Sequence, residues 1–397
     1  MRLISLALAL TAPSAVAFAC GPLGDNGAPA SEAVQMDDIQ GLRPDIGFVG
    51  VRDLTLTEGM VWVLDEAPPF LTRISLADGS AVQVGTKGEG PGEFRAPWAV
   101  QPALEDGQPE SVQVWDLGNA RVSRMGMDGT FLGSGPLDKA NGLKARGNIR
   151  ELSYVDPFRV RNTSNGIVSG HYHRPVNGTL DILLGTLQIV DQHLRPEREV
   201  VRFVDGVDLK HATSPVWASV PLWDACGGVI AVWNPLSSGV QWFDSGGQLI
   251  GHNPVQVPLR TVGSAAILAY IRWRVRVESE SGFRAPEPYI QRLERRYRPI
   301  FPKEAPPVTD IRCQAPGTAW LRLFDTSQDP VGRSQTWQRV TDRSGHRRIT
   351  FPPGFTPLAF TGEGAFGLIT GSDGLEHVAN WSDPTSTPSP KPPLHSQ

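Results

Sequence analysis

The sequence predicts an all-β fold, and three observations lead to this prediction. The 397 residues include 42 Gly, 35 Pro and 11 Trp but only 20% charged residues, which suits many short strands joined by sharp turns. Segments with strand periodicity recur along the chain, at a spacing of roughly 40 to 50 residues. A glycine-rich stretch, 85–97, joins two of these segments and is typical of a boundary between repeated sheets.

The repeated unit begins with an apolar run, turns, and continues as an alternating strand that ends in a Gly hairpin. Its copies begin at Val61–Asp65, Val112–Asp116, Val229–Trp233 and Thr318–Phe324, with a weaker copy at Ile182–Val190. An apolar run indicates a strand that is buried on both faces, and a Gly hairpin lets the next strand return beside it. Because the units show strand periodicity and no repeated helix, they predict the four-stranded blades of a β-propeller.

The units predict one domain, residues 33–382, with six blades. The approximate blade boundaries are 50–94, 95–137, 138–206, 207–256, 305–356 and 357–382. The last blade is one strand short, and we expect Ala33–Met36 to supply its outer strand. Such a strand closes the ring between the two ends of the domain.

One region, about 261–302, breaks the pattern between blades 4 and 5. Ala265–Ile271 and Pro288–Tyr297 carry apolar residues at helical spacing, which predicts a short helical insertion. The alternation of Ile271–Val277 favours a strand there instead. Four arginines of this region form either an anion-binding patch or a solvated helix face, the second being favoured: Arg292, Arg295, Arg296 and Arg298.

The stretch 85–97 also carries a resemblance to a known family. Its glycines are followed by Phe94 as an apolar plug and by Pro97 at the entry to the next strand. This arrangement resembles the blade junction of NHL-repeat propellers, and the whole chain is similar to six-bladed propellers of unknown function from environmental bacteria. The resemblance implies a propeller but no particular activity.

The N-terminus has the layout of a secretory signal peptide, residues 1–19, with a basic residue before an apolar run and small residues before Cys20. Ala17–Cys20 resembles a bacterial lipobox, in which Cys20 becomes the lipidated first residue of the exported protein. Cleavage before Cys20 without lipid is the alternative. The run is too short to span a membrane, so we expect membrane attachment only through a lipid anchor.

The composition of the two ends predicts little structure outside the domain. Residues 20–32 are rich in Gly, Ala and Pro and predict a flexible tether. Residues 383–397 are rich in Pro, Ser and Thr and predict a disordered tail. We therefore expect an exported protein, periplasmic or anchored to the outer membrane of a bacterium, and a monomer.

The cysteines fit such a compartment. Once Cys20 is processed, Cys226 and Cys313 remain, each before a Gly-containing turn and an apolar strand of neighbouring units. An exported protein can keep such a pair oxidised, but two separate buried thiols fit the sequence equally well.

Few residues stand out as chemical groups. His171 and His173 lie two apart on a predicted strand and therefore share a face, which makes them weak metal candidates; exposed hairpin histidines are the favoured alternative. Asp65, Asp116 and Asp244 end strands, where a carboxylate can accept hydrogen bonds from the turn backbone. The tryptophans Trp98, Trp115, Trp233 and Trp320 predict packing between blades, although one exposed at the channel would stack on a sugar or peptide.

The function that the sequence favours is binding. A net charge of −4 gives no electrostatic reason to bind nucleic acid, and no nucleophile elbow or phosphate-binding loop occurs. We expect a binding or scaffold propeller whose loop face takes a protein, peptide or glycan ligand and which needs no cofactor. The alternative, implied by the six-bladed relatives, is a metal-dependent hydrolase or lyase of the lactonase type with Ca²⁺ or Zn²⁺ in the central channel.

Overall fold

The computed structural model describes most of the domain that the sequence predicts. The described residues are 31–42, 45–105, 108–137, 152–155, 159–164, 166–175, 183–191, 195–205, 222–234, 239–257, 260–278, 286–298, 301, 303–305, 307–324, 334–341 and 347–386. The signal peptide, Cys20 and most of the tether and tail lie outside them, so those expectations stay predictions.

Six antiparallel sheets form the blades, as predicted. Blades 1 and 2 are β3 (Val51–Thr57), β4 (Met60–Asp65), β5 (Leu71–Ser75) and β6 (Ala81–Val84), then β9 (Pro97–Glu105), β10 (Gln108–Asp116), β11 (Arg121–Gly126) and β12 (Phe131–Pro136). Blades 3 and 4 are β13 (Leu152–Val155), β14 (Val160–Thr163), β15 (Gly166–Pro175), β16 (Leu183–Val190) and β17 (Pro196–Asp205), then β18 (Leu222–Cys226), β19 (Val229–Asn234), β20 (Gly239–Asp244) and β21 (Leu249–Pro254). Blades 5 and 6 are β24 (Val308–Ala315), β25 (Thr318–Leu323), β26 (Gln335–Thr341) and β27 (Arg347–Phe351), then β28 (Phe355–Phe360), β29 (Gly364–Thr370) and β30 (Glu376–Ser382).

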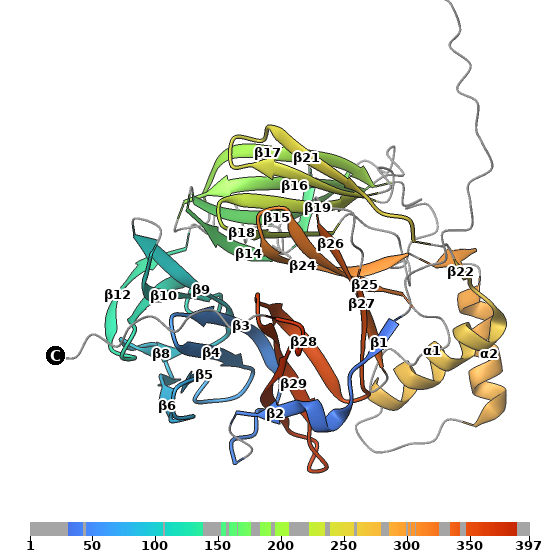
Figure 1. The fold of residues 1–397 in the computed structure, drawn as a ribbon, viewed down its shortest axis with the longest axis horizontal. Coiled ribbons are helices and arrows are strands. Elements are labelled where there is room, and N and C mark those ends of the chain that lie inside the picture. The colour runs from blue at the N-terminus through green and yellow to red at the C-terminus, as the bar shows by residue number, and fades with distance from the viewer. Residues whose placement is uncertain are drawn as a thin grey trace, which may run out of the picture. The chain divides into compact units, whose positions relative to one another are not determined.

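The innermost strands close a ring. Each contacts the innermost strand of the next blade, in the order β3, β9, β14, β18, β24, β28 and back to β3. Figure 1 shows the sheets following one another around this ring in the order of the chain, with the last blade beside the first. This closure makes the domain a six-bladed propeller.

The N-terminal segment joins two blades. β2 (Ile39–Gly41) pairs antiparallel with β30 as the outer strand of blade 6, and β1 (Ser31–Ala33) pairs parallel with β27 as a fifth strand of blade 5. A 3-10 helix, Met36–Asp38, connects them. The predicted closure therefore exists, but the prediction that Ala33–Met36 forms the outer strand is wrong. Ile39 makes the difference, because its buried side chain packs in the core that contains Trp381.

The cores lie between neighbouring blades. Trp115, Trp233 and Trp320 are buried in clusters that combine side chains of adjacent blades, which confirms their predicted packing role. At the junction of blades 1 and 2, β7 (Thr86–Lys87) pairs parallel with β8 (Glu93–Phe94). Phe94 is fully buried there, and a side chain at Gly85 would collide with its ring.

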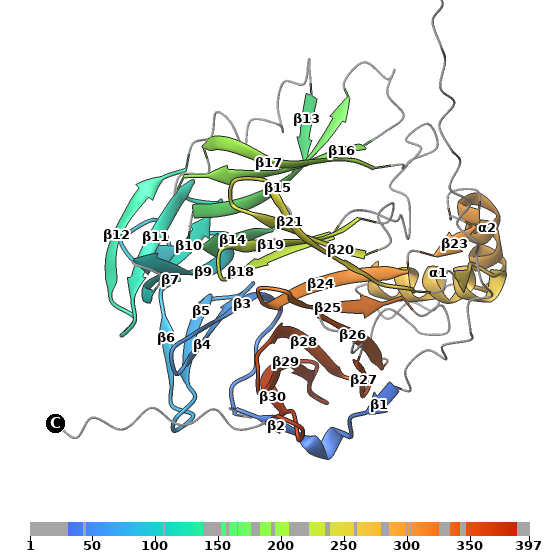
Figure 2. The same ribbon diagram turned by 45° about the horizontal axis from the view of Figure 1, so that its top comes forward.

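The predicted insertion between blades 4 and 5 is helical. α1 (Ser264–Glu278) and α2 (Glu287–Tyr297) contact each other beside a small sheet of β22 (Arg260–Thr261) and β23 (Glu304–Ala305). In both views the helix pair lies at the edge of the domain (Figure 1, Figure 2). The strand expected at Ile271–Val277 is wrong, since these residues belong to α1 and Ile271 packs against Ile290 and Phe301. Among the described residues, no helix has the length and apolar character needed to cross a membrane.

Candidate functional site

Charged side chains gather on the innermost strands of four blades. We call this set the channel cluster, and its members are Asp53, Arg159, Arg161, Asp224, Asp310 and Arg312. Arg159 and Arg161 flank the first residue of β14, and Asp310 and Arg312 lie two apart on β24, so each pair presents its side chains on one face of an extended chain. All six side chains are between 7% and 19% exposed.

Asp224 joins blades 3, 4 and 5. Its Oδ1 accepts a hydrogen bond from Arg161 Nε at 2.7 Å and lies 3.7 Å from Arg159 Nη1. Its Oδ2 accepts a hydrogen bond from the backbone N–H of Cys313 at 2.8 Å. The cluster thus fixes the spacing of three innermost strands.

Asp310 is shared between two arginines. Arg159 Nη2 donates to its Oδ1 at 2.9 Å, and Arg312 donates to its Oδ2 through Nε at 3.0 Å. Arg159 also donates through Nη1 to the carbonyl groups of Trp223 and Ile311, at 2.7 and 3.0 Å. Three hydrogen bonds from Arg159 are thus made within the fold.

Asp53 ties blade 1 to blade 2. Its Oδ2 accepts hydrogen bonds from the N–H of Val100 at 3.0 Å and from Gln101 Nε2 at 3.2 Å, and its Oδ1 lies 3.8 Å from Arg161 Nη1. Asp53 therefore lies at the channel, whereas Glu58, the next acidic residue of blade 1, is exposed in the turn between β3 and β4.

The pKa values in the cluster follow from burial and from these pairs. Burial alone would raise the pKa of Asp310, but the charges of Arg312 and Arg159 outweigh it and lower the pKa to about 2. Arg161 and Arg159 lower the pKa of Asp224 against burial in the same way. Burial would lower the pKa of Arg159, yet Asp310 and Asp224 raise it.

Arg312 behaves differently from Arg159. Burial lowers its pKa, Asp310 compensates only in part, and the positive charge of Arg159 acts in the same direction as burial. The pKa of Arg322 is lowered by burial as well. Burial is thus the main reason why the charged form of both arginines is disfavoured.

A hollow of about 180 Å³ opens beside the cluster, and we call it the channel hollow. It is lined by Arg52, Asp53, Trp98, Ala99, Arg159, Val160, Arg161 and Arg312. Four lining residues are arginines and one is an aspartate, and the arginines pair with Asp53, Asp224, Asp310 and Glu66. The hollow is therefore rich in the N–H donors that an anion needs. Trp98 also lines the hollow and supplies an aromatic face. A tryptophan at the channel is the residue that we expect to stack on a sugar or peptide.

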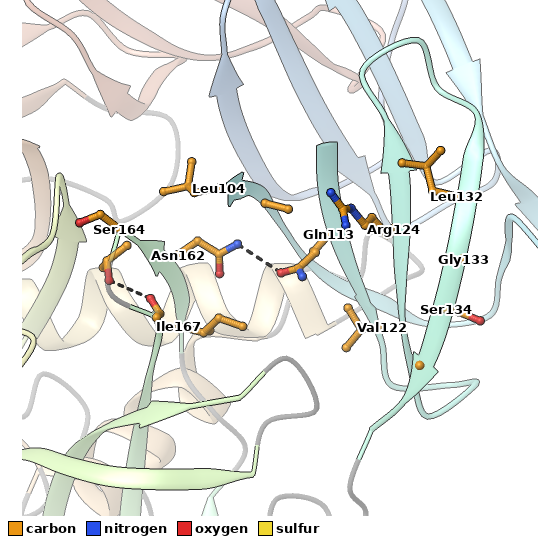
Figure 3. A pocket seen from close by; sticks show the side chains of 14 residues that line it. Leu104, Gln113, Val122, Arg124, Leu132, Gly133, Ser134, Asn162, Ser164 and Ile167 are labelled. Atoms are coloured by element: carbon orange, nitrogen blue, oxygen red, sulfur yellow. Dashed lines mark hydrogen bonds between the residues drawn. The ribbon is translucent and has the colours of Figure 1, made fainter. Parts of the chain in front are cut away.

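A second hollow lies between blades 2 and 3, with a volume of about 480 Å³. Figure 3 shows Arg124 and Leu132 on one side of this interblade cleft and Asn162 and Ile167 on the other. Asn162 Nδ2 donates to Gln113 Oε1 at 3.3 Å across it. The cleft is larger than the channel hollow, but only one ionisable side chain, Arg124, lines it.

The strand-end aspartates have the structural role that the sequence predicted. Asp116 accepts hydrogen bonds from the N–H groups of Arg95, Ala96, Gly118 and Asn119, at 2.9 to 3.3 Å. In blade 1, Asp65 binds the N–H groups of Val49, Gly50 and Glu66. Asp244 accepts a hydrogen bond from the N–H of Gln248 at 2.8 Å.

The other candidates lie away from the cluster or touch its edge. His171 and His173 lie on β15, one strand outward from the innermost strand of blade 3, opposite Thr186 and Leu184; a metal role for them stays a prediction. Within the described ranges, no three His, Cys, Asp or Glu side chains come together as a metal site. Cys226 and Cys313 form a disulfide between β18 and β24, next to the amide that binds Asp224.

Two arginines of the helical insertion contact different partners on the surface of α2. Arg298 pairs with Glu294 at 2.6 Å, and Arg292 lies over the ring of Tyr289, 5.3 Å from its centroid. Both arginines are exposed, as expected for a solvated helix face.

Sequence patterns alone did not identify most of the channel cluster, although one pattern in the sequence does point to it. Arg159–Arg161 and Asp310–Arg312 place charges two apart on strands that precede the apolar runs of their blades. What the sequence does not show is that Arg159 and Asp310, 151 residues apart, meet.

Comparisons with known proteins give only distant likenesses. No protein-family model matches the sequence, and no curated protein matches it. A "Putative exported protein" from Bacteroides fragilis is 9% identical, covers 88% of this chain and 93% of its own, and gives a TM-score of 0.45. A member of the DUF4221 family from Bacteroides vulgatus is 7% identical over 87% of this chain and 95% of its own, with a TM-score of 0.46. At these identities the likeness is one of fold alone.

Proposed function

We propose that this chain is an exported binding or scaffold propeller that takes part of a protein, peptide or glycan ligand into the channel hollow. The observation that carries the proposal is the set of four arginines that line that hollow, of which Arg159, Arg161 and Arg312 are held in place by Asp224 and Asp310. Buried arginines that are already oriented lose little conformational freedom when they bind, so they are suited to recognition.

The compartment is part of the proposal. A structural disulfide such as Cys226–Cys313 is typical of proteins outside the cytoplasm. We propose that the protein is held at a bacterial membrane, in the periplasm or at the outer membrane, by a lipid on Cys20. Labelled fatty acid should enter the wild-type protein in a bacterial host and not the Cys20→Ser variant; equal labelling of both would contradict the anchor.

A binding experiment tests the function. Defined peptide and glycan arrays are probed with the full-length protein, with Arg312→Glu and with Arg124→Glu as the matched control in the interblade cleft. We expect array signals that the channel variant loses and the control keeps. Signals that Arg312→Glu leaves unchanged would place the ligand elsewhere.

A metal test addresses the enzymatic alternative. The melting temperature is measured with EDTA and then with Ca²⁺ or Zn²⁺. A ligand at 100 times its dissociation constant adds about 2.7 kcal/mol of stability, which appears as a shift of several degrees. We expect no shift, because arginines already engage the carboxylates of the cluster; a clear rise would favour the metal-dependent hydrolase.

A further inference from the structure

Two arginines of the channel hollow keep hydrogen-bond donors that the fold does not use. Arg161 donates through Nε to Asp224 and through Nη1 to the carbonyl of Val160, and its Nη2 has no partner among the described residues. Arg312 contacts Asp310 through Nε and Nη2, and its Nη1 has none there either. A guanidinium carries five N–H donors, so each arginine has at least two left.

Both of these arginines line the hollow. The formal charges around it balance in number, because Arg159, Arg161 and Arg312 have Asp53, Asp224 and Asp310 within reach and Arg52 has Glu66 at 3.6 Å. What the hollow offers an anion is therefore its unused N–H donors. Burial lowers the pKa of Arg312, and Asp310 compensates only in part. A bound anion would stabilise the charged form of Arg312.

Size and shape narrow the choice of anion. A hollow of about 180 Å³ holds roughly six water molecules by liquid volume, which is room for the charged end of a ligand and not for a polymer segment. Planar guanidinium forks match the two coplanar oxygens of a carboxylate. Trp98 then lies where the carbon atoms beside that carboxylate would pack.

We propose that the channel hollow binds one carboxylate group, held by the free donors of Arg161 and Arg312 and packed against Trp98. The inference rests on the proposed function and names the ligand group at the same site. It selects acidic ligands from the protein, peptide and glycan classes, and a free peptide C-terminus is the smallest source.

Calorimetric titration of the full-length protein with small probes tests the inference. Trialanine with a free carboxyl terminus is compared with trialanine amide, galacturonate with galactose, and inorganic phosphate is a separate arm. We expect binding of the acids and none of their neutral partners. Binding of only one acid identifies the source; equal binding of acid and amide, or binding of phosphate alone, would overturn the carboxylate assignment.

Variants connect the titration to the site. In Arg312→Gln, Asp310 keeps Arg159 as its partner, so the fold should survive while the affinity for the acid falls about ten- to a hundredfold. Arg312→Lys keeps the charge without the fork and should fall between, and Arg124→Gln should match the wild type. An acid that binds Arg312→Gln as tightly as the wild type would overturn the assignment. A further outcome separates the two proposals. If Arg312→Glu loses its array signals but the titrations show no preference for acids over their neutral partners, the proposed function holds and the carboxylate assignment is refuted.

Discussion

Two sets of buried aspartates in this propeller use their carboxylates differently. At the blade junctions, Asp65 and Asp116 accept hydrogen bonds from backbone N–H groups of their own blades, each of which has only one donor to give. In the channel, Asp224 and Asp310 bind guanidinium groups from other blades and, in the case of Arg312, from the strand of Asp310 itself; Arg161 and Arg312 keep free donors. Burial of a carboxylate therefore does not indicate a binding site; unused donors on its partners do.

We expect the largest effect on stability from removing the carboxylate of Asp116 at its blade junction. Asp116→Ala removes an acceptor from four backbone amides at a fully buried position, so we expect a loss of about 3 to 5 kcal/mol in the free energy of unfolding. Urea unfolding measures it, with Asp116→Asn as a control that keeps one oxygen and loses less. The affinity of the channel hollow for an acidic probe should not change. A loss below about 1 kcal/mol would mean that water replaces the carboxylate at the junction.

The disulfide links the two innermost strands that carry Asp224 and Asp310. Replacing Cys226 and Cys313 together by Ser opens a cross-link between residues 87 apart in sequence. We expect a loss of about 2 to 4 kcal/mol, seen as a lower melting temperature. Because the cross-link also holds the backbone N–H of residue 313 beside Asp224, acid binding should weaken as well when the link is removed. Unchanged binding would show that the salt bridges alone hold the site.

The pH dependence of unfolding tests the ion pairs that Asp310 makes in the channel cluster. The folded pKa of Asp310 is about 2, below its ordinary value of 3.8, so its contribution is complete above about pH 4 and is lost as the pH falls towards 2. The lost stability is on the order of 2 kcal/mol. Asp310→Asn should remove this part of the pH dependence, measured by urea unfolding from pH 5 to pH 2. Identical pH profiles would mean that Asp310 is not stabilised by its arginines.

The smallest expected effect concerns the apolar side of the hollow. Trp98→Leu keeps some packing against blade 3 but removes the aromatic face, and we expect the dissociation constant of an acidic probe to rise two- to fivefold, from a loss of about 0.5 to 1 kcal/mol. Titration measures it, with the melting temperature as the control for packing. A change as large as that of Arg312→Gln would make Trp98 the main contact.

The fold was more predictable from the sequence than the site. Blade cores follow from local patterns, such as the apolar run Val61–Leu64 and the glycine junction before Phe94, and these patterns repeat. The closing strand was misplaced because its position depends on which side chain reaches the core of blade 6, and that side chain is Ile39. The salt bridges between Arg159, Asp224 and Asp310 join residues of three blades, and only the closure of the ring brings them together.

A crystal structure of the full-length protein grown with an excess of trialanine tests the carboxylate site in the channel hollow most directly. We expect density for a carboxylate there, with its oxygens within hydrogen-bond distance of Arg161 Nη2 and Arg312 Nη1. The Asp116 side chain and the amides that it binds should keep their positions. Peptide density in the interblade cleft beside Arg124, with only water between Arg161 and Arg312, would contradict a carboxylate site in the channel hollow.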